Sequence, residues 1–410
     1  MKKKLNRIGM GMYRMSIRDK NHLSVLTHAV NEGVNLIDSA PNYSLGDSEK
    51  LVGSLWDSHK RKEVFLLTKV GYISGKDRDK YAHLISNGKA IKLSENSFYS
   101  LEKEFINEQI ESSLKRMKID YIDCLLIHNP EYYISKAGYT ISEIHDKLRD
   151  ICEELERIVS SKLIRSYGIS SNIMPQWGID LERIFRKKRM LFPNFKFVQF
   201  PYNLVENEAS KKIDGYSLSL IEYCKKHGIK TIANRPLNTT YENKVLRLAN
   251  YTNEFIDVDF KKEEILFHSF LKTIKQQLEK FGENGDLEDF APLKFLINNR
   301  KKISNPEAVQ RAVDVYLYPF IEKLQFTDSS IIKMIKELSD YWVLFSKKSI
   351  TERALKLKTE LIKKGVIDVK DNRKLSVIAC ESYLKDGIDH VLVGMRKKKY
   401  IDDFAEIINS

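Results

Sequence analysis

The sequence lacks the features that mark secreted, disulfide-linked and membrane-spanning proteins. Its four cysteines are far apart and form no CxxC pair, so neither a disulfide framework nor a cysteine metal site is expected. No apolar run approaches the roughly 18 residues that a membrane span needs. The N-terminus, MKKKLNRIGMGMYRM, is basic but has no apolar segment and no cleavage site, so no secretory signal is predicted. Together these absences favour a cytoplasmic protein with reduced thiols.

The composition is that of a globular protein with an excess of positive charge. The chain has 410 residues, 42% of them hydrophobic and 30% charged, and a net charge of +13. Such a charge favours anionic partners in general. The densest basic clusters are FRKKRM (Phe185–Met190) and MRKKKY (Met395–Tyr400), but the other lysines are spread along the chain. We therefore expect no nucleic-acid partner and no membrane partner, and no histidine or cysteine spacing predicts a metal site.

Apolar runs typical of strands alternate with helical patterns through the first 235 residues, and one more strand pattern follows near the C-terminus. Runs that are apolar on both faces, alternating with helices, indicate a parallel sheet covered by helices. Eight such units predict an α/β fold of the (β/α)8, or TIM, barrel type. The expected strands are Arg7–Tyr13, Val34–Ile37, Val64–Thr68, Tyr121–Ile127, Ile164–Ile169, Phe195–Phe200, Lys230–Ala233 and His390–Val393.

One long interval interrupts this alternation. From Asn238 to Asp371 the sequence is poor in Gly and Pro, and its apolar residues recur at helical spacing, as in Leu271, Ile274 and Leu278. We interpret residues 239–372 as a large, mostly helical insertion between strand 7 and helix 7, with residues 1–238 and 373–410 as the barrel. Its apolar stripes are interpreted as the insertion's own core. Further helices are expected over Ala308–Leu324, Ser330–Phe345, Thr351–Lys364 and, back in the barrel, Leu375–Lys385.

A second excess of chain lies between the third strand and its helix. The segment Gly71–Ser100 is far longer than the two to six residues usual for such a connection. Long loops on the C-terminal rim of a barrel are where substrates meet the protein. Aromatic residues in the rim loops either line a substrate pocket or pack the loops down, and the sequence leaves both readings open: Tyr81, Phe98, Tyr99, Tyr132 and Tyr133.

Polar side chains stand at the ends of three successive expected strands. Asp38, Lys69 and His128 end the second, third and fourth strands, and Tyr43 lies in the loop after Asp38. Each has a structural reading: a turn or N-cap aspartate, a rim tyrosine, a snorkelling lysine and a buried structural histidine. Because the ends of neighbouring parallel strands lie together, the set favours one pocket.

The four side chains suit proton transfer to a carbonyl oxygen. A lysine ammonium beside a phenol stabilises phenolate, so Lys69 is expected to lower the pKa of Tyr43. Asp38 would hold Lys69 in place and keep it charged, and His128 would hydrogen-bond the substrate oxygen. Tyr43 would then act as the general acid. No side chain here can supply a hydride, so the reaction calls for a nicotinamide.

Six motifs, in order, resemble landmarks of the aldo-keto reductase superfamily: DSAPNYS, LLTKV, SLKRMKIDYIDCLLIHNPE, SYGISS, VQFPYNL and HVLVGMR. They cover residues 5–238 and 373–410. The resemblance implies a (β/α)8 barrel that binds NADP(H) without a Rossmann fold, with Asp38, Tyr43, Lys69 and His128 as catalytic residues. It also implies contacts to the nicotinamide amide, which fall on Ser170, Ser171 (or Asn172) and Gln199.

The sequence departs from the family pattern where the cofactor is expected. After strand seven, TIANRPLN offers Asn234 and then Arg235 in place of the usual aromatic platform, for which Tyr202 is an alternative. The C-terminal cofactor motif keeps Gly394 and Arg396, followed by three lysines. This positive charge favours NADP(H) over NAD(H). Arg235, Gly394 and Arg396 therefore join the expected cofactor-binding residues.

These observations predict an NAD(P)H-dependent reductase of aldehydes or ketones, or the reverse alcohol or sugar oxidation, acting on a small-molecule carbonyl compound. The alternative is a cofactor-binding regulatory or scaffold protein with weak or no turnover, which would use the helical insertion as a partner surface. The sequence does not identify the substrate, the physiological direction or the oligomeric state.

Overall fold

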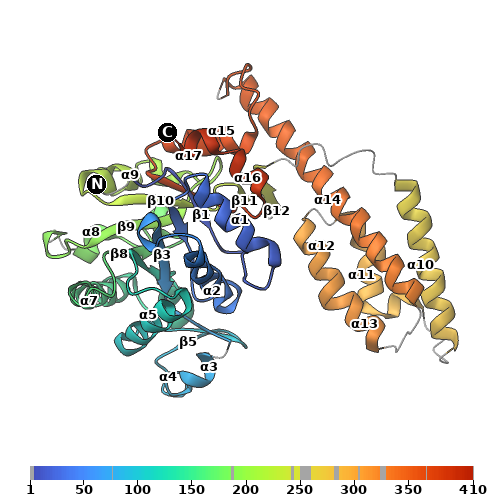
Figure 1. The fold of residues 1–410 in the computed structure, drawn as a ribbon, viewed down its shortest axis with the longest axis horizontal. Coiled ribbons are helices and arrows are strands. Elements are labelled where there is room, and N and C mark those ends of the chain that lie inside the picture. The colour runs from blue at the N-terminus through green and yellow to red at the C-terminus, as the bar shows by residue number, and fades with distance from the viewer. Residues whose placement is uncertain are drawn as a thin grey trace. The chain divides into compact units, whose positions relative to one another are not determined.

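The structure is a computed structural model of the chain and describes residues 4–75, 77–185, 189–241, 244–249, 260–280, 286–302, 305–323, 329–365 and 367–409. Residues 186–188 of the predicted basic cluster lie outside these ranges. The chain divides into two compact units, one comprising Met1–Val245 with Val377–Ser410 and the other Leu246–Ser376 (Figure 1).

The first unit is a closed barrel of eight parallel strands, which confirms the predicted fold class. The strands are β1 (Ile8–Gly11), β2 (Leu36–Asp38), β3 (Phe65–Val70), β7 (Cys124–His128), β8 (Tyr167–Ser170), β9 (Phe195–Pro201), β10 (Lys230–Asn234) and β13 (His390–Val393). Around the barrel they follow the order β1-β13-β10-β9-β8-β7-β3-β2. Alternate strand residues such as Leu67, Leu126 and Ile232 form a separate buried apolar cluster. These residues fill the barrel, as the period-two alternation of strand side chains requires.

Helices surround the strands in Figure 1. They are α1 (Lys20–Asn31), α2 (Asp47–Gly53), α5 (Lys103–Met117), α6 (Tyr132–Ala137), α7 (Ile141–Ser160), α8 (Leu181–Phe185), α9 (Leu220–Lys226), α15 (Leu375–Lys385), α16 (Lys398–Asp402) and α17 (Ala405–Ile408). Helix α7 shows why they form: Thr140 and Glu143 make a capping box at its start. Its buried Ile144, Leu148 and Ile151 recur at helical spacing and face the main core.

The long connection after β3 has regular structure of its own. It forms an antiparallel sheet in the order β4 (Tyr72–Ser74), β6 (Ser97–Tyr99), β5 (Ile91–Ser94), with the short helices α3 (Asp77–Lys80) and α4 (Ala82–Ser86). We call this segment the rim sheet. It is anchored to the barrel by Gln109 of α5, which accepts from the Gly71 amide and donates to the Tyr72 carbonyl, both at 2.8 Å. Gly71 has φ of 137°, and a Cβ there would lie 2.4 Å from the Tyr99 ring, so this position requires glycine.

The second unit is a helical bundle with its own apolar core. Its helices are α10 (Phe260–Lys280), α11 (Ala291–Asn299), α12 (Pro306–Ala312), α13 (Tyr318–Lys323) and α14 (Ser329–Lys363). Before them in the chain, β11 (Asn238–Tyr241) and β12 (Lys244–Arg247) form a two-stranded sheet. They follow β10 and precede α15, as the sequence predicts for an insertion. Inside the bundle, Glu263 accepts from Arg300 at 3.0 Å and from Trp342 at 2.9 Å. The role of residues 239–372 as an independent domain remains a prediction.

The helical stretch expected from Ala308 onward is present as α12, a π-helical turn at Val313–Leu317 and α13, which follow one another without a break. One other prediction in this unit is wrong. The two helices expected over Ser330–Phe345 and Thr351–Lys364 are one continuous helix of 35 residues, α14. Within the described residues, no helix combines the length and apolar character needed to cross a bilayer.

Candidate active site

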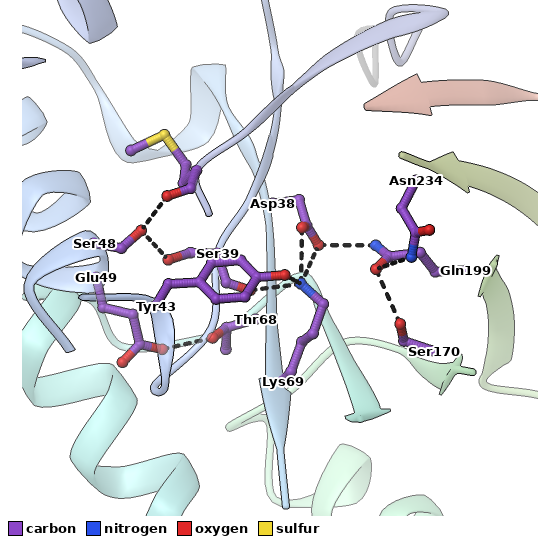
Figure 2. Close-up of polar contacts among 11 residues, drawn as sticks. Asp38, Ser39, Tyr43, Ser48, Glu49, Thr68, Lys69, Ser170, Gln199 and Asn234 are labelled. Carbon is purple, nitrogen blue, oxygen red and sulfur yellow. Dashed lines mark hydrogen bonds and ion pairs between the residues drawn. The ribbon is translucent and has the colours of Figure 1, made fainter. Parts of the chain in front are cut away.

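Asp38, Tyr43 and Lys69 meet at the C-terminal end of the barrel, as Figure 2 shows. Lys69 lies in β3 and is fully buried. Its Nζ donates to both carboxylate oxygens of Asp38 at 2.8 Å and to the Tyr43 hydroxyl at 3.0 Å. It also donates to the Ser39 carbonyl at 2.9 Å. The structure therefore brings together three of the four side chains that the strand ends predicted.

The loop after β2 holds Tyr43 in this position. The Ser39 amide donates to the Leu67 carbonyl of β3 at 2.9 Å, so the loop continues the register of the sheet for one more residue. The Ser39 and Ser48 hydroxyls are 2.9 Å apart, and Ser48 also donates to the Met12 carbonyl at 3.2 Å. These contacts fix the start of the loop to β3 and its end to the segment after β1.

Burial and the neighbouring charges act in opposite directions on both Lys69 and Tyr43. Burial alone would lower the pKa of Lys69, but the Asp38 carboxylate and the Tyr43 oxygen together raise it above the ordinary 10.5. Burial raises the pKa of Tyr43 above 10.0, although the Lys69 charge acts in the opposite direction. The expectation that Lys69 brings the pKa of Tyr43 below its ordinary value is therefore wrong for this arrangement. The reason is that desolvation of the phenolate is larger than the attraction of one ammonium that Asp38 already neutralises.

His128 ends β7 and faces the same group of side chains. Its ring lies edge to face with Tyr43, with the ring centroids 6.2 Å apart, and against Tyr72 at 4.9 Å. Burial, followed by the nearby charge of Lys69, holds the pKa of His128 well below 6.5, so the imidazole is neutral at neutral pH. Its Nδ1 atom is buried and has no hydrogen-bond partner. Aromatic contacts thus hold the ring, and a ring nitrogen remains unsatisfied.

Sequence reasoning missed a buried carboxylate, Glu49, which bonds to the residue next to Lys69. Glu49 of α2 is fully buried and accepts from the Thr68 hydroxyl at 2.5 Å and from Arg116 Nε at 2.6 Å. Thr68 immediately precedes Lys69 in β3. Glu49 therefore ties α2 and α5 to the strand that carries the lysine. The signal in the sequence was the pair Ser48–Glu49 at the start of a helix, where a buried charge is not expected without a partner.

The predicted cofactor residues Ser170 and Gln199 form one network with Asp38 (Figure 2). The Gln199 Nε2 atom donates to Asp38 Oδ1 at 3.0 Å, and Gln199 Oε1 accepts from the Ser170 hydroxyl at 3.0 Å. The Asn234 amide nitrogen lies 3.4 Å from the same Gln199 oxygen, whereas Asn234 Oδ1 is buried without a partner. Three neighbouring strands, β8, β9 and β10, thus present amide and hydroxyl groups beside the buried charges.

Asn172 is held by protein contacts on every side. Its backbone and side-chain nitrogens donate to Glu131 Oε1 at 2.9 and 3.0 Å, and its Oδ1 accepts from Arg235. Ser171 is buried, and its hydroxyl accepts from the Ile173 amide at 3.3 Å. The choice between Ser171 and Asn172 as a nicotinamide contact stays open. The Asn172–Arg235 contact joins the loops that follow β8 and β10.

The remaining predicted cofactor residues have different surroundings. Tyr202 is 1% exposed, its ring packs in the main core and its hydroxyl donates to Asp386 at 3.0 Å. Tyr202 therefore presents no ring face to a ligand, and its alternative role as a platform is not supported. Gly394 is exposed, with nothing within 4 Å of the position a Cβ would take. Arg396 follows it and is partly exposed.

The rim aromatics mostly pack the rim sheet down. Tyr81, Phe98, Tyr99 and Tyr133 are all buried, at 2, 8, 0 and 4% exposure. The ring that faces the site is Tyr72, which the sequence reading did not single out. Its hydroxyl accepts from Asn129 at 2.8 Å and lies 2.9 Å from the Tyr132 hydroxyl. Within the described residues, no cluster of three or more His, Cys, Asp or Glu side chains could hold a metal ion.

Comparison with known proteins identifies the family. The model of the aldo/keto reductase family matches residues 7–300. The chain belongs to the aldo/keto reductase family. Five of the six landmark motifs lie within the matched residues, and the sixth, HVLVGMR at residues 390–396, lies beyond them. The family match does not test the role of any single residue.

Individual relatives are distant and only partly covered. Aldo-keto reductase YhdN of Bacillus subtilis (strain 168) is 26% identical over 234 residues, which is 55% of this chain and 57% of the relative. The NADH-specific methylglyoxal reductase of Escherichia coli (strain K12) is 24% identical over 206 residues, 50% of this chain and 53% of the relative. This aldo/keto reductase thus spans little more than half the length of these two relatives.

Solved structures of similar proteins are also aldo-keto reductases. The holo form of an enzyme from Bacillus halodurans is 20% identical, with a TM-score of 0.41 over 62% of this chain and 78% of that one. An enzyme from Klebsiella pneumoniae in complex with NADP and acetate is 22% identical, with a TM-score of 0.37 over 57% and 65% of the two chains.

Proposed function

We propose that this family member is a nicotinamide-dependent reductase of aldehydes or ketones in which Tyr43 is the general acid. The observation that carries the proposal is the buried contact of Lys69 Nζ with the Tyr43 hydroxyl at 3.0 Å, backed by Asp38 at 2.8 Å. A fully buried lysine between a carboxylate and a phenol has a clear chemical use. It stabilises negative charge on the phenol oxygen at the moment that the oxygen gives up its proton.

The titration behaviour of the site suits reduction at neutral pH. Tyr43 keeps its proton, because burial raises its pKa above 10.0, and it can donate that proton to a carbonyl oxygen. Lys69 is charged and neutralises the phenolate that results, while Asp38 keeps Lys69 oriented. His128 is neutral and offers a ring nitrogen to the substrate oxygen. A nicotinamide, when bound, supplies the hydride that the carbonyl carbon needs.

The residues present fit such a cofactor. Ser170, Gln199 and the unpartnered Asn234 Oδ1 form a polar surface at three adjacent strand ends, next to the buried charges. Open space at Gly394, followed by Arg396 and three lysines, suits a phosphate group. We therefore propose NADP(H) over NAD(H). Because one relative is named as NADH-specific, both cofactors belong in every assay.

The test is the Tyr43→Phe variant. Oxidation of NADPH and of NADH is followed with a panel of aldehydes, ketones and sugars, and cofactor affinity is measured by fluorescence titration. We expect Tyr43→Phe to lower kcat by about 10²- to 10⁴-fold with little change in cofactor affinity, because only the proton donor is removed. The matched control is Tyr13→Phe, since Tyr13 stacks edge-on against Tyr43 but is 64% exposed. Unchanged turnover in Tyr43→Phe would exclude the assignment.

The same screen decides the alternative. Cofactor binding without cofactor oxidation over the whole panel would support a regulatory or scaffold protein instead of a reductase. The complete buried contact set of Asp38, Tyr43 and Lys69 favours turnover, because proton transfer gives a use for an ion pair that is costly to bury. A small-molecule carbonyl substrate and a cytoplasmic location belong to the proposal, and four buried free cysteines agree with a reducing compartment. A protein partner for the insertion stays a prediction.

A further inference from the structure

Gln199 makes a hydrogen bond to a side chain on the opposite wall of the barrel. It lies on β9, and Asp38 lies on β2, and these strands stand opposite each other in the closed order of eight. The 3.0 Å bond from Gln199 Nε2 to Asp38 Oδ1 therefore crosses the mouth of the barrel. Both side chains are buried, at 2 and 3% exposure. A hydrogen bond to a buried carboxylate is among the stronger kinds in proteins.

The hydrogen-bond partners fix which way the Gln199 amide points. A carboxylate only accepts hydrogen bonds, so the end of Gln199 that faces Asp38 must be the NH2 group. The other end accepts from the Ser170 hydroxyl at 3.0 Å and lies 3.4 Å from the Asn234 amide nitrogen. The side chain is thus held at both ends, and its NH2 group is committed to Asp38.

Asp38 in turn holds the proton-donor pair. Lys69 Nζ binds both of its carboxylate oxygens, and the same nitrogen reaches the Tyr43 hydroxyl (Figure 2). If Lys69 were its only partner, the Asp38 carboxylate could rotate about its Cβ–Cγ bond, and the flexible lysine side chain would move with it. Gln199 supplies a second donor from the opposite wall, which fixes the plane of the carboxylate. A displacement of about 1 Å at such a centre can cost roughly a hundredfold in rate.

We infer that Gln199 is a positioning residue for proton transfer: it orients Asp38, and through Asp38 it sets the place of Lys69 against Tyr43. This inference rests on the proposed reductase function and goes beyond the role of Gln199 as a cofactor contact. It also implies that Ser170 and Asn234, which contact Gln199 Oε1, help to position Asp38 and Lys69 through Gln199.

The kinetic test compares two substitutions of Gln199. Gln199→Met keeps the length and apolar volume and removes the donor, so kcat at saturating NADPH should fall roughly 10- to 100-fold, as for a lost bond to a charged group. The Kd for NADPH, measured by fluorescence, reports any cofactor contact of Gln199 separately, and its change should be smaller than the fall in kcat. Ser170→Ala removes a bond at the far end of Gln199 and should lower kcat less than Gln199→Met does.

Gln199→Glu adds a pH readout that a merely structural role would not give. The new carboxyl on β9 would face Asp38 on β2. The other titratable neighbours are Lys69 on β3, Tyr43 in the loop after β2 and His128 on β7. Two carboxylates this close share a proton. Once protonated, the new carboxyl can donate to Asp38 as the amide does. The ratio of kcat in Gln199→Glu to kcat in Gln199→Met should therefore rise as the pH falls.

The opposite pattern would overturn the inference. If Gln199→Met raises the Kd for NADPH tenfold or more and leaves kcat unchanged, Gln199 is a cofactor contact alone. If the wild-type protein shows no turnover, the proposed function fails, and thermal unfolding still tests the positioning contact. Gln199→Met should then lower the melting temperature more in the wild type than in an Asp38→Asn background, where the acceptor is uncharged. Equal losses in the two backgrounds would refute it.

Discussion

Removal of the buried ammonium is the most demanding test of the site as a unit. In Lys69→Met the four hydrogen bonds of Nζ are lost, and Asp38 is left buried with Gln199 as its donor. Loss of one partner of a buried ion pair costs about 3–5 kcal/mol, because the other charge stays in a medium that solvates it poorly. For a unit of roughly 280 residues, that corresponds to a fall of roughly 5–9 °C in the melting temperature.

A double variant separates the ion pair from simple loss of packing. Asp38→Asn alone leaves Lys69 as an unpaired buried cation, so each single variant contains one uncompensated charge. The double variant Lys69→Met/Asp38→Asn contains none and should be more stable than either single variant. Thermal unfolding by circular dichroism at pH 7 measures all four proteins. Losses that simply add in the double variant would refute the reasoning.

The chain offers a matched control for this experiment. Lys230 pairs with Asp389 at 2.7 Å, a distance close to that of the Lys69–Asp38 pair, but the Lys230 side chain is 56% exposed. Water solvates both charges there, so Lys230→Met should cost at most about 1 kcal/mol. A similar loss at both lysines would mean that burial does not set the energy of the Lys69–Asp38 pair.

Three further predictions concern other parts of the barrel. The pKa of His128 lies well below 6.5 in the folded chain and near 6.5 in the unfolded one, so protonation of His128 favours unfolding in acid. The difference in melting temperature between the wild type and His128→Asn should therefore shrink from pH 7 to pH 5. A constant difference would contradict this prediction. Gly53→Ala places a Cβ 2.7 Å from the Arg116 carbonyl and should destabilise by about 1–3 kcal/mol, whereas Gly394→Ala, which meets open space, should leave unfolding unchanged. Arg396→Ala should raise the Kd for NADPH more than that for NADH, and equal effects would argue against a 2′-phosphate contact.

The barrel and three members of the site could be predicted because each depends on local pattern. Apolar runs give the strands, and a polar residue at the end of such a run is expensive unless it has a partner. Six of the eight predicted strands end one or two residues too early, as in Val34–Ile37 against β2 at Leu36–Asp38 and Val64–Thr68 against β3 at Phe65–Val70. The shift has a physical cause. Asp38 and Lys69 remain within the hydrogen-bonded ladder, whereas a pattern based on hydrophobicity stops before the first charge.

The contacts that sequence reasoning missed are those between elements remote in the chain. Gln199 and Asp38 are 161 residues apart, and Glu49 and Arg116 are 67 apart. No periodicity relates such positions, and only the closed order of the strands brings them together. The net shift of the Tyr43 pKa was missed for a related reason. Its direction depends on how deeply the ring is buried, and a list of neighbouring charges does not contain that quantity.

The two long segments added to the barrel, the rim sheet and the helical insertion, each follow a strand and not a helix. The rim sheet follows β3, and the helical insertion follows β10, so each starts where a strand delivers a site residue, Lys69 or Asn234. Parallel strands are held by their neighbours over their whole length, and extra chain at a strand end costs the sheet no ladder bonds. Loop-closure entropy also rises only slowly with length. The barrel can therefore keep the register that joins Asp38, Lys69 and Gln199 while the segments that follow β3 and β10 change in length.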